Sequence, residues 1–184
     1  MTTGSLQYRL NKTPEEANDI AQQYWKAFPR IQPWINEVIR IATYQKFIRY
    51  WSGRIWREED PVFSYKGANA QIQGGAADLM SIALMRADKI LTAQNWGFIL
   101  SIVHDEALYE IKDECIEIAS NVLARVMQVE DIFGFPFSTE VKIGKSYGNL
   151  ETPEFRIDPT KVEWEYFQEP RIILDFSSIK ELAG

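Results

Sequence analysis

Two adjacent carboxylates interrupt an apolar stretch in the second half of the chain. Asp105 and Glu106 follow His104 and separate two short apolar runs, residues 98–103 and 107–111. Two such runs around a brief polar interruption predict a β-hairpin with the carboxylates at its tip. That position suits a divalent cation, because Mg²⁺ binds a few carboxylate oxygens and keeps water or phosphate oxygens at its other positions. An acidic turn without a ligand is the alternative.

A second polar group comes earlier in the chain. Asn69 and Gln73 are four residues apart, so a helix places both amides on one face. An amide donates and accepts hydrogen bonds, which suits the acceptors exposed in a DNA minor groove. Gly74 and Gly75 follow, although glycine costs a helix roughly 1 kcal/mol relative to alanine. Close approach of a ligand explains that cost, and so does tight packing of the helix on a neighbour.

The first third of the chain is predicted to be mainly helical. A Thr-Pro-Glu-Glu sequence beginning at Thr13 is typical of a capped helix start, and this helix ends at Pro29. A second helix follows Pro33. Residues 47–57 predict a short hairpin around a Ser-Gly turn, with Arg54 among aromatic side chains.

The remaining pattern mixes helices with strands. Residues 69–94 predict a long helix with one apolar stripe, and residues 98–103 a buried strand. Asp113 caps a predicted helix that runs to about residue 129. Residues 137–143 alternate apolar with polar side chains and predict a half-exposed strand, whereas residues 151–170 suggest a tail or linker. The predicted fold class is α+β.

The composition and net charge of the chain limit which class of protein it can be. The chain has 184 residues, of which 46% are hydrophobic and 25% charged, as in an ordinary globular domain. A net charge of −6 argues against a stand-alone nucleic-acid binder. The charge is uneven, however. Residues 1–70 contain ten Lys or Arg against seven Asp or Glu, so this aromatic-rich part could still meet phosphate.

Cysteine usage and hydropathy indicate a cytoplasmic protein. Cys115 is the one cysteine, so no disulfide forms within the chain. A lone His and a distant Cys, without paired spacing, argue against a zinc cluster. The sequence contains neither an apolar signal segment nor 18 consecutive apolar residues, so we expect no membrane association.

Together the two polar groups resemble family A (DNA polymerase I-like) polymerases. The pattern N-x-x-x-Q-G-x-A-A-D from Asn69 is followed, about 30 residues later, by V-H-D-E. The resemblance runs in unbroken order over residues 1–150. It implies a fingers-derived segment of helices and a hairpin (residues 1–66) and a partial palm (residues 67–150). The partial palm consists of a long helix, a β-hairpin carrying motif C, a helix and a final strand. Residues 151–184 would be a C-terminal extension.

The resemblance assigns metal-binding roles to the hairpin tip. Asp105 matches the catalytic, metal-binding aspartate of motif C, and Glu106 matches its acidic neighbour. His104 matches the histidine near the primer terminus. The implied chemistry is two-metal nucleotidyl transfer with Mg²⁺, or possible substitution by Mn²⁺.

The resemblance also implies DNA contacts. Asn69 and Gln73 match amides that touch the nascent base pair and the primer–template minor groove, and Arg54 matches a basic residue near the DNA. Tyr65 and Gln71 depart from the family pattern, which has an arginine and a proline there. These departures affect details of DNA contact rather than the metal site.

The elements that precede this segment in the family are a motif A aspartate and a nucleotide-binding fingers helix. We therefore expect an N-terminal polymerase subunit as partner, with primer–template DNA and dNTP as substrates. Such a split polymerase is typical of phages, which predicts an obligate heterodimer in a bacterial host cell. A non-catalytic, polymerase-like protein that binds DNA or scaffolds replication is the alternative, and an unrelated α+β interaction domain is a more distant one.

The C-terminal residues add one further possibility. The sequence L-D-F-S-S-I around Asp175 resembles motif A, although Lys180 stands where the family has glutamate. In a permuted palm Asp175 would be the second metal ligand. Otherwise this segment is a tail strand that docks on the palm or on the partner.

Overall fold

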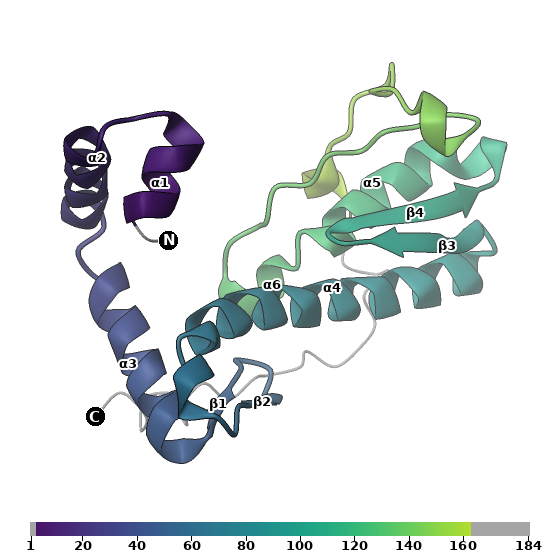
Figure 1. Cartoon of the computed structure of the whole chain (residues 1–184). Coiled ribbons are helices and arrows are strands. Elements are labelled where there is room, and N and C mark those ends of the chain that lie inside the picture. The colour runs from purple at the N-terminus through teal and green to yellow at the C-terminus, as the bar shows by residue number, and fades with distance from the viewer. Residues whose placement is uncertain (1–2, 163–184) are drawn as a thin grey trace. The chain divides into compact units, whose positions relative to one another are not determined.

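The computed structural model describes residues 3–162 and has an α+β fold (Figure 1). The chain divides into two compact units, one extending to Ile72 and the other beginning at Gln73. The boundary falls inside the long helix α4 (Lys66–Gln94). No helix within residues 3–162 is both long and apolar enough to cross a membrane.

The first unit begins with three helices, α1 (Thr3–Leu10), α2 (Pro14–Ala27) and α3 (Ile31–Gln45). The predicted capping box of α2 is confirmed: the Glu16 amide donates to Thr13 Oγ1 at 3.2 Å, and the Thr13 amide donates to Glu16 Oε2 at 2.9 Å. The sequence did not predict α1. Helix α3 starts before Pro33 rather than after it, because a first-turn proline lacks only an N–H that the helix does not use.

A small hairpin completes the first unit. Strands β1 (Phe47–Arg49) and β2 (Ile55–Arg57) pair antiparallel, as the sequence predicted, and the 3₁₀ turn η1 (Pro61–Phe63) leads to α4. The first turns of α4 pack against α3. The buried core of this unit consists of Val38, Ala42, Ile48, Tyr50 and Ala68.

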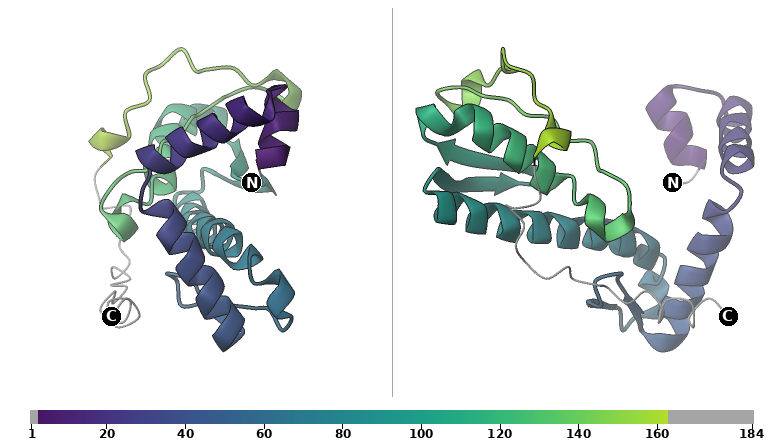
Figure 2. Two further views of the ribbon diagram at one scale, coloured as in Figure 1. Left: turned by 60° about the vertical axis from the view of Figure 1, so that its left-hand side comes forward. Right: turned by 180° about the vertical axis from the view of Figure 1, so that it is seen from behind.

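The second unit is a hairpin packed on two helices (Figures 1 and 2). Strands β3 (Gly97–Val103) and β4 (Glu106–Ile111) are antiparallel, and α5 (Ile116–Met127) follows the short turn η2 (Asp113–Cys115). The short helix α6 (Glu130–Phe133) comes next. Buried side chains from α4 and α5 form the core, chiefly Ala83, Ala87, Ile90, Leu91, Ala119, Val122, Leu123 and Val126.

Residues 98–103 form a strand, as the sequence predicted, but the prediction that this strand is buried is wrong. Phe98, Leu100 and Ile102 are 51–55% exposed, and Ile99 alone among the large side chains of β3 packs against the core. The reason is that α4 and α5 cover one side of a two-stranded sheet, and no third strand pairs with it among residues 3–162.

The predicted final strand at residues 137–143 is also wrong. The segment forms only one isolated bridge, between Ile143 and Glu151. A strand requires a neighbour for its backbone groups, and the described residues supply none beyond Glu151. The short turns η3 (Tyr147–Asn149) and η4 (Pro159–Lys161) follow.

Residues 151–162, expected to be a tail or linker, contact the core. The Asp158 amide donates to Asn121 Oδ1 of α5 at 2.6 Å, and Val162 packs against the buried cluster.

Tyr109 yields a prediction about stability at alkaline pH. Its phenol donates to Met127 Sδ at 3.4 Å, and burial raises the pKa of this phenol from 10.0 to about 12. At pH 11 an unfolded tyrosine is mostly ionised while the folded one is not, so ionisation favours unfolding. We expect Tyr109 to remove about 1.4 kcal/mol of unfolding free energy between pH 8 and pH 11.

Urea unfolding of the wild type and Tyr109→Phe at both pH values measures this difference. The phenylalanine variant should lose less stability than the wild type by that amount. Tyr44→Phe, which alters a ring that is 76% exposed, is the control. Equal alkaline losses in the wild type and Tyr109→Phe would contradict the prediction.

Candidate functional site

The tip of the β3–β4 hairpin carries the predicted carboxylates. Val103 pairs with Glu106, so His104 and Asp105 form a two-residue turn, and all three polar side chains are exposed. His104 has φ 57°, a left-handed conformation that is uncommon for residues other than glycine. The hairpin expected from the sequence is confirmed, with Asp105 and Glu106 adjacent at its end.

A β-bulge at Leu100 determines which residues form that turn. Ile99 pairs with Tyr109 and Ser101 pairs with Leu108, so Leu100 has no partner. Without this extra residue the register would shift by one, and the turn would include another residue of β3. The bulge therefore pairs Val103 with Glu106 and leaves only His104 and Asp105 in the turn.

At the base of the hairpin the backbones of β3 and β4 approach each other closely. Gly97 pairs with Ile111, and a Cβ at position 97 would overlap the carbonyl oxygen of Glu110. The Lys112 amide donates to the Trp96 carbonyl at 2.8 Å. Packing and pairing at the base therefore support the exposed tip.

The Glu106 carboxylate also contacts a segment that is distant in the sequence. The Tyr147 hydroxyl donates to Glu106 Oε2 at 3.3 Å. Sequence reasoning missed Tyr147, because it lies 41 residues from Glu106 and belongs to none of the motifs.

The donor set at the tip fits part of a site for a hard cation. Two adjacent carboxylates match Mg²⁺, which commonly takes one or two protein carboxylates together with waters and substrate phosphates. Within residues 3–162 no group of three or more His, Cys, Asp or Glu side chains could hold a metal ion. Among residues 3–162, Asp105 and Glu106 would therefore supply only part of a cation site. Asp175, the alternative second ligand, lies outside the described residues.

Helix α4 presents the two predicted amides. Asn69 and Gln73 are exposed, and their i,i+4 spacing puts them on one face of the continuous helix. Gln71, between them, donates through Nε2 to the Arg49 carbonyl at 3.3 Å. Gly75 is buried. Gln71 is thus engaged in packing, whereas Asn69 and Gln73 present their amides at the surface.

Arg54 belongs to the first unit. Its guanidinium lies 4.5 Å above the centre of the Tyr50 ring, and its carbonyl accepts from the Tyr50 amide at 2.7 Å. This cation–π contact orients an exposed cation. The structure therefore groups the predicted residues as three at the tip of the β3–β4 hairpin, two on one face of α4, and Arg54 on the β1–β2 hairpin.

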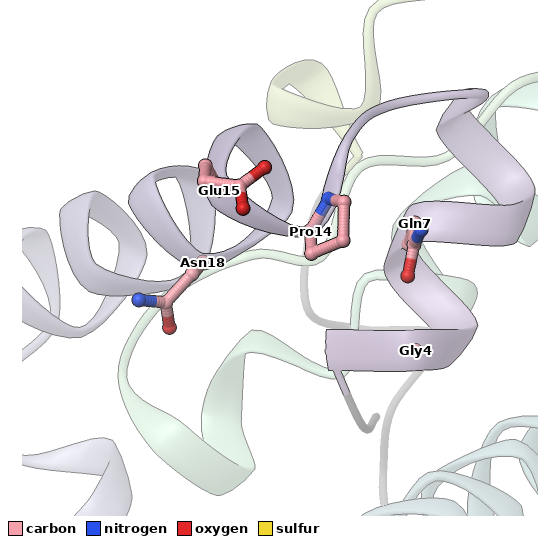
Figure 3. A pocket seen from close by; sticks show the side chains of 5 residues that line it. All are labelled: Gly4, Gln7, Pro14, Glu15 and Asn18. Carbon is pink, nitrogen blue, oxygen red and sulfur yellow. The ribbon is translucent and has the colours of Figure 1, made fainter.

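A shallow pocket of about 340 Å³ lies between α1 and α2 (Figure 3). Gly4 and Gln7 of α1 and Pro14, Glu15 and Asn18 of α2 line it. None of these is a predicted site residue, and Glu15 is the one charged side chain among them. The candidate chemistry is therefore on the exposed hairpin tip and not in this pocket.

Comparison with known proteins finds one family along most of the chain. The model of DNA polymerase family A matches residues 1–149. DNA polymerase I of Lactococcus lactis subsp. cremoris is 26% identical over 152 residues, and the thermostable DNA polymerase I of Thermus aquaticus 27% over 156. These alignments cover 77% and 80% of this chain but 17% and 19% of the relatives, so the chain spans less than a fifth of their length.

A solved structure is similar in fold. The POL domain of Pol1 from M. smegmatis, in a complex with DNA primer-template and dNTP, superposes with a TM-score of 0.63 at 22% identity. The similarity covers 70% of this chain and 24% of that one.

The left-handed backbone of His104 predicts an unusual order of variant stabilities. His104→Gly should be as stable as the wild type or up to about 1 kcal/mol more stable, because glycine adopts positive φ without a steric cost. His104→Val should lose about 1–2 kcal/mol, because a β-branched side chain disfavours positive φ. Urea unfolding measures both.

The same substitutions at Ser101 are the matched control. Ser101 is exposed and lies in β3, where valine favours and glycine disfavours an extended strand. The order of the two variants should therefore reverse. A His104→Val variant as stable as His104→Gly would contradict the left-handed turn.

Proposed function

The chain belongs to DNA polymerase family A, and we propose that it contributes motif C carboxylates to a DNA-directed DNA polymerase that performs two-metal nucleotidyl transfer. One observation carries the proposal: Asp105 and Glu106 are adjacent and exposed at the end of a hairpin that lies within the family match.

In this proposal Asp105 and Glu106 hold divalent cations, with Mg²⁺ as the physiological ion and Mn²⁺ as a substitute. When bound, such ions lower the pKa of the primer 3′-hydroxyl and stabilise charge on the transferred phosphate and the leaving pyrophosphate. Asp105 is the catalytic ligand, and Glu106 supports the site from the neighbouring position. His104 lies near the primer terminus.

The chain also supplies primer–template contacts. Asn69 and Gln73 reach acceptors of the minor groove from the exposed face of α4, because an amide can donate to N3 or O2 of any base pair. Arg54 contacts the DNA backbone, where a guanidinium oriented by Tyr50 binds phosphate through a planar fork. The exposure of all three side chains supports these roles.

A second polypeptide completes the active site. We propose an N-terminal subunit that carries motif A and the nucleotide-binding fingers helix, as in a split phage-type polymerase in the cytoplasm of a bacterial host. Two observations support a completing segment: the donor set within residues 3–162 contains only two carboxylates, and β3 exposes Phe98, Leu100 and Ile102. Covering such a surface in an obligate heterodimer buries well over about 2,000 Å².

Removal of the Asp105 carboxylate tests the proposal. The chain is co-expressed with neighbouring genes of its source, and the purified complex is assayed by primer extension. A metal ligand contributes several kcal/mol to a charged transition state, so Asp105→Ala should lower the extension rate about 10³-fold. The variant should still co-purify with its partner.

The matched control is Glu110→Gln, which removes an exposed carboxylate from the same hairpin. It should extend primers at the wild-type rate. Wild-type extension by Asp105→Ala refutes the catalytic assignment. If no preparation extends primers and none binds Mn²⁺, the protein is a non-catalytic DNA-binding or scaffold protein. Extension by the chain alone would contradict partner dependence and make Asp175 the second ligand.

Removal of the α4 amides should affect DNA rather than metal. One hydrogen bond contributes about 0.5–1.5 kcal/mol, so Asn69→Ala and Gln73→Ala should each raise the KM for primer–template roughly threefold to tenfold. Both variants should bind Mn²⁺ with the same affinity as the wild type in a titration. Gln94→Ala removes an exposed amide at the other end of α4 and is the control. Weaker Mn²⁺ binding in the two variants would argue against these separate roles.

A further inference from the structure

A closed loop approaches the hairpin tip from another part of the chain. Ile143 and Glu151 exchange two backbone hydrogen bonds, of 2.8 and 2.9 Å, which join the ends of the loop. A Cβ at Gly144 would overlap the carbonyl oxygen of Asn149, so the loop closes this tightly because position 144 is glycine. Figure 2 shows the loop in green, beside α5 and the β3–β4 hairpin.

Part of this loop is outside the family match. The match ends at residue 149, so Glu151, which closes the loop, belongs to the extension that follows. That extension is attached to α5, where the Asp158 amide donates to Asn121 Oδ1 at 2.6 Å. Val162 then packs against the core. The extension therefore stabilises the loop from its C-terminal side.

Two side chains of the loop contact β4 and the turn η2 that follows it. Lys145 Nζ lies 3.0 Å from an Asp113 oxygen, but both side chains are at least 75% exposed, and such surface pairs contribute little to stability. The Tyr147 hydroxyl donates to Glu106 Oε2 at 3.3 Å. This is the contact through which the loop reaches the candidate site.

We infer that Tyr147 is a positioning residue that orients the Glu106 carboxylate for cation binding. The phenol is a neutral donor that engages one carboxylate oxygen, so the other oxygen and Asp105 remain available to a cation. The distance exceeds the usual 2.7–2.8 Å of an O–H···O bond. We therefore expect this hydrogen bond to affect the orientation of the Glu106 carboxylate more than the stability of the fold.

This inference rests on the proposed function, and Tyr147→Phe tests it. The variant keeps the ring and loses the donor. In the full chain purified with its co-expressed partner, Mn²⁺ affinity is measured from the paramagnetic resonance signal of free Mn²⁺. Loss of one hydrogen bond should weaken Mn²⁺ binding about threefold to tenfold, and the Mg²⁺ concentration that half-activates primer extension should rise similarly. The melting temperature and the KM for primer–template should not change.

A double-mutant cycle separates positioning from a general structural effect. In a Glu106→Ala background the phenol has no carboxylate to orient, so Tyr147→Phe should cause no further loss of Mn²⁺ affinity. Tyr8→Phe, which alters a ring that is 90% exposed, is the control. Wild-type Mn²⁺ affinity in Tyr147→Phe overturns the inference, as does an equal loss in both backgrounds.

One comparison distinguishes failure of this inference from failure of the proposed function. If Asp105→Ala abolishes extension and weakens Mn²⁺ binding while Tyr147→Phe does neither, the positioning role alone is refuted. If Asp105→Ala leaves both unchanged, the proposed function is refuted and this inference with it.

Discussion

The position of the carboxylate pair depends on the packing of the β3–β4 hairpin against α4 and α5. An isolated two-stranded hairpin is marginally stable in water, so its register needs support from elsewhere. Ile99, Tyr109 and Ile111 provide that support by packing against the buried cluster of the two helices. All three are partly buried, so each contributes less than the roughly 1.5–3 kcal/mol of a fully buried apolar side chain. Slippage by one residue would turn these side chains to the opposite face, and the tip would then consist of different residues.

The same hairpin is incomplete on its other side. Phe98, Leu100 and Ile102 are about half exposed. Within the described part of the chain, each strand of the two-stranded sheet has one edge without a partner strand. Exposed edges and apolar side chains favour association with another strand. The candidate donor set at the end of these same strands has two carboxylates among residues 3–162. In the proposed polymerase, one docking event therefore covers the apolar surface and brings the remaining ligands to the tip.

Local signals were sufficient to predict much of the secondary structure. The capping box of α2, both hairpins and the extent of α4 follow from caps, turns and periodicity within short windows. Burial and pairing were not predictable in the same way. Residues 98–103 and 137–143 have apolar patterns, yet their environment depends on segments far away in the sequence. For the same reason sequence analysis identified Asp105 and Glu106, which are adjacent, and missed Tyr147, which reaches Glu106 only through the fold.

The geometry of the turn explains how an exposed pair of carboxylates can be held in place. A two-residue turn is the shortest common hairpin connection, and here it leaves Glu106 on the first ladder position of β4. Strand positions hold a side chain more firmly than long loops do. The left-handed backbone is confined to His104, so Asp105 and Glu106 avoid that strain. The bulge at Leu100 makes this arrangement possible, because it moves the register by the one residue that separates a two-residue turn from a longer one.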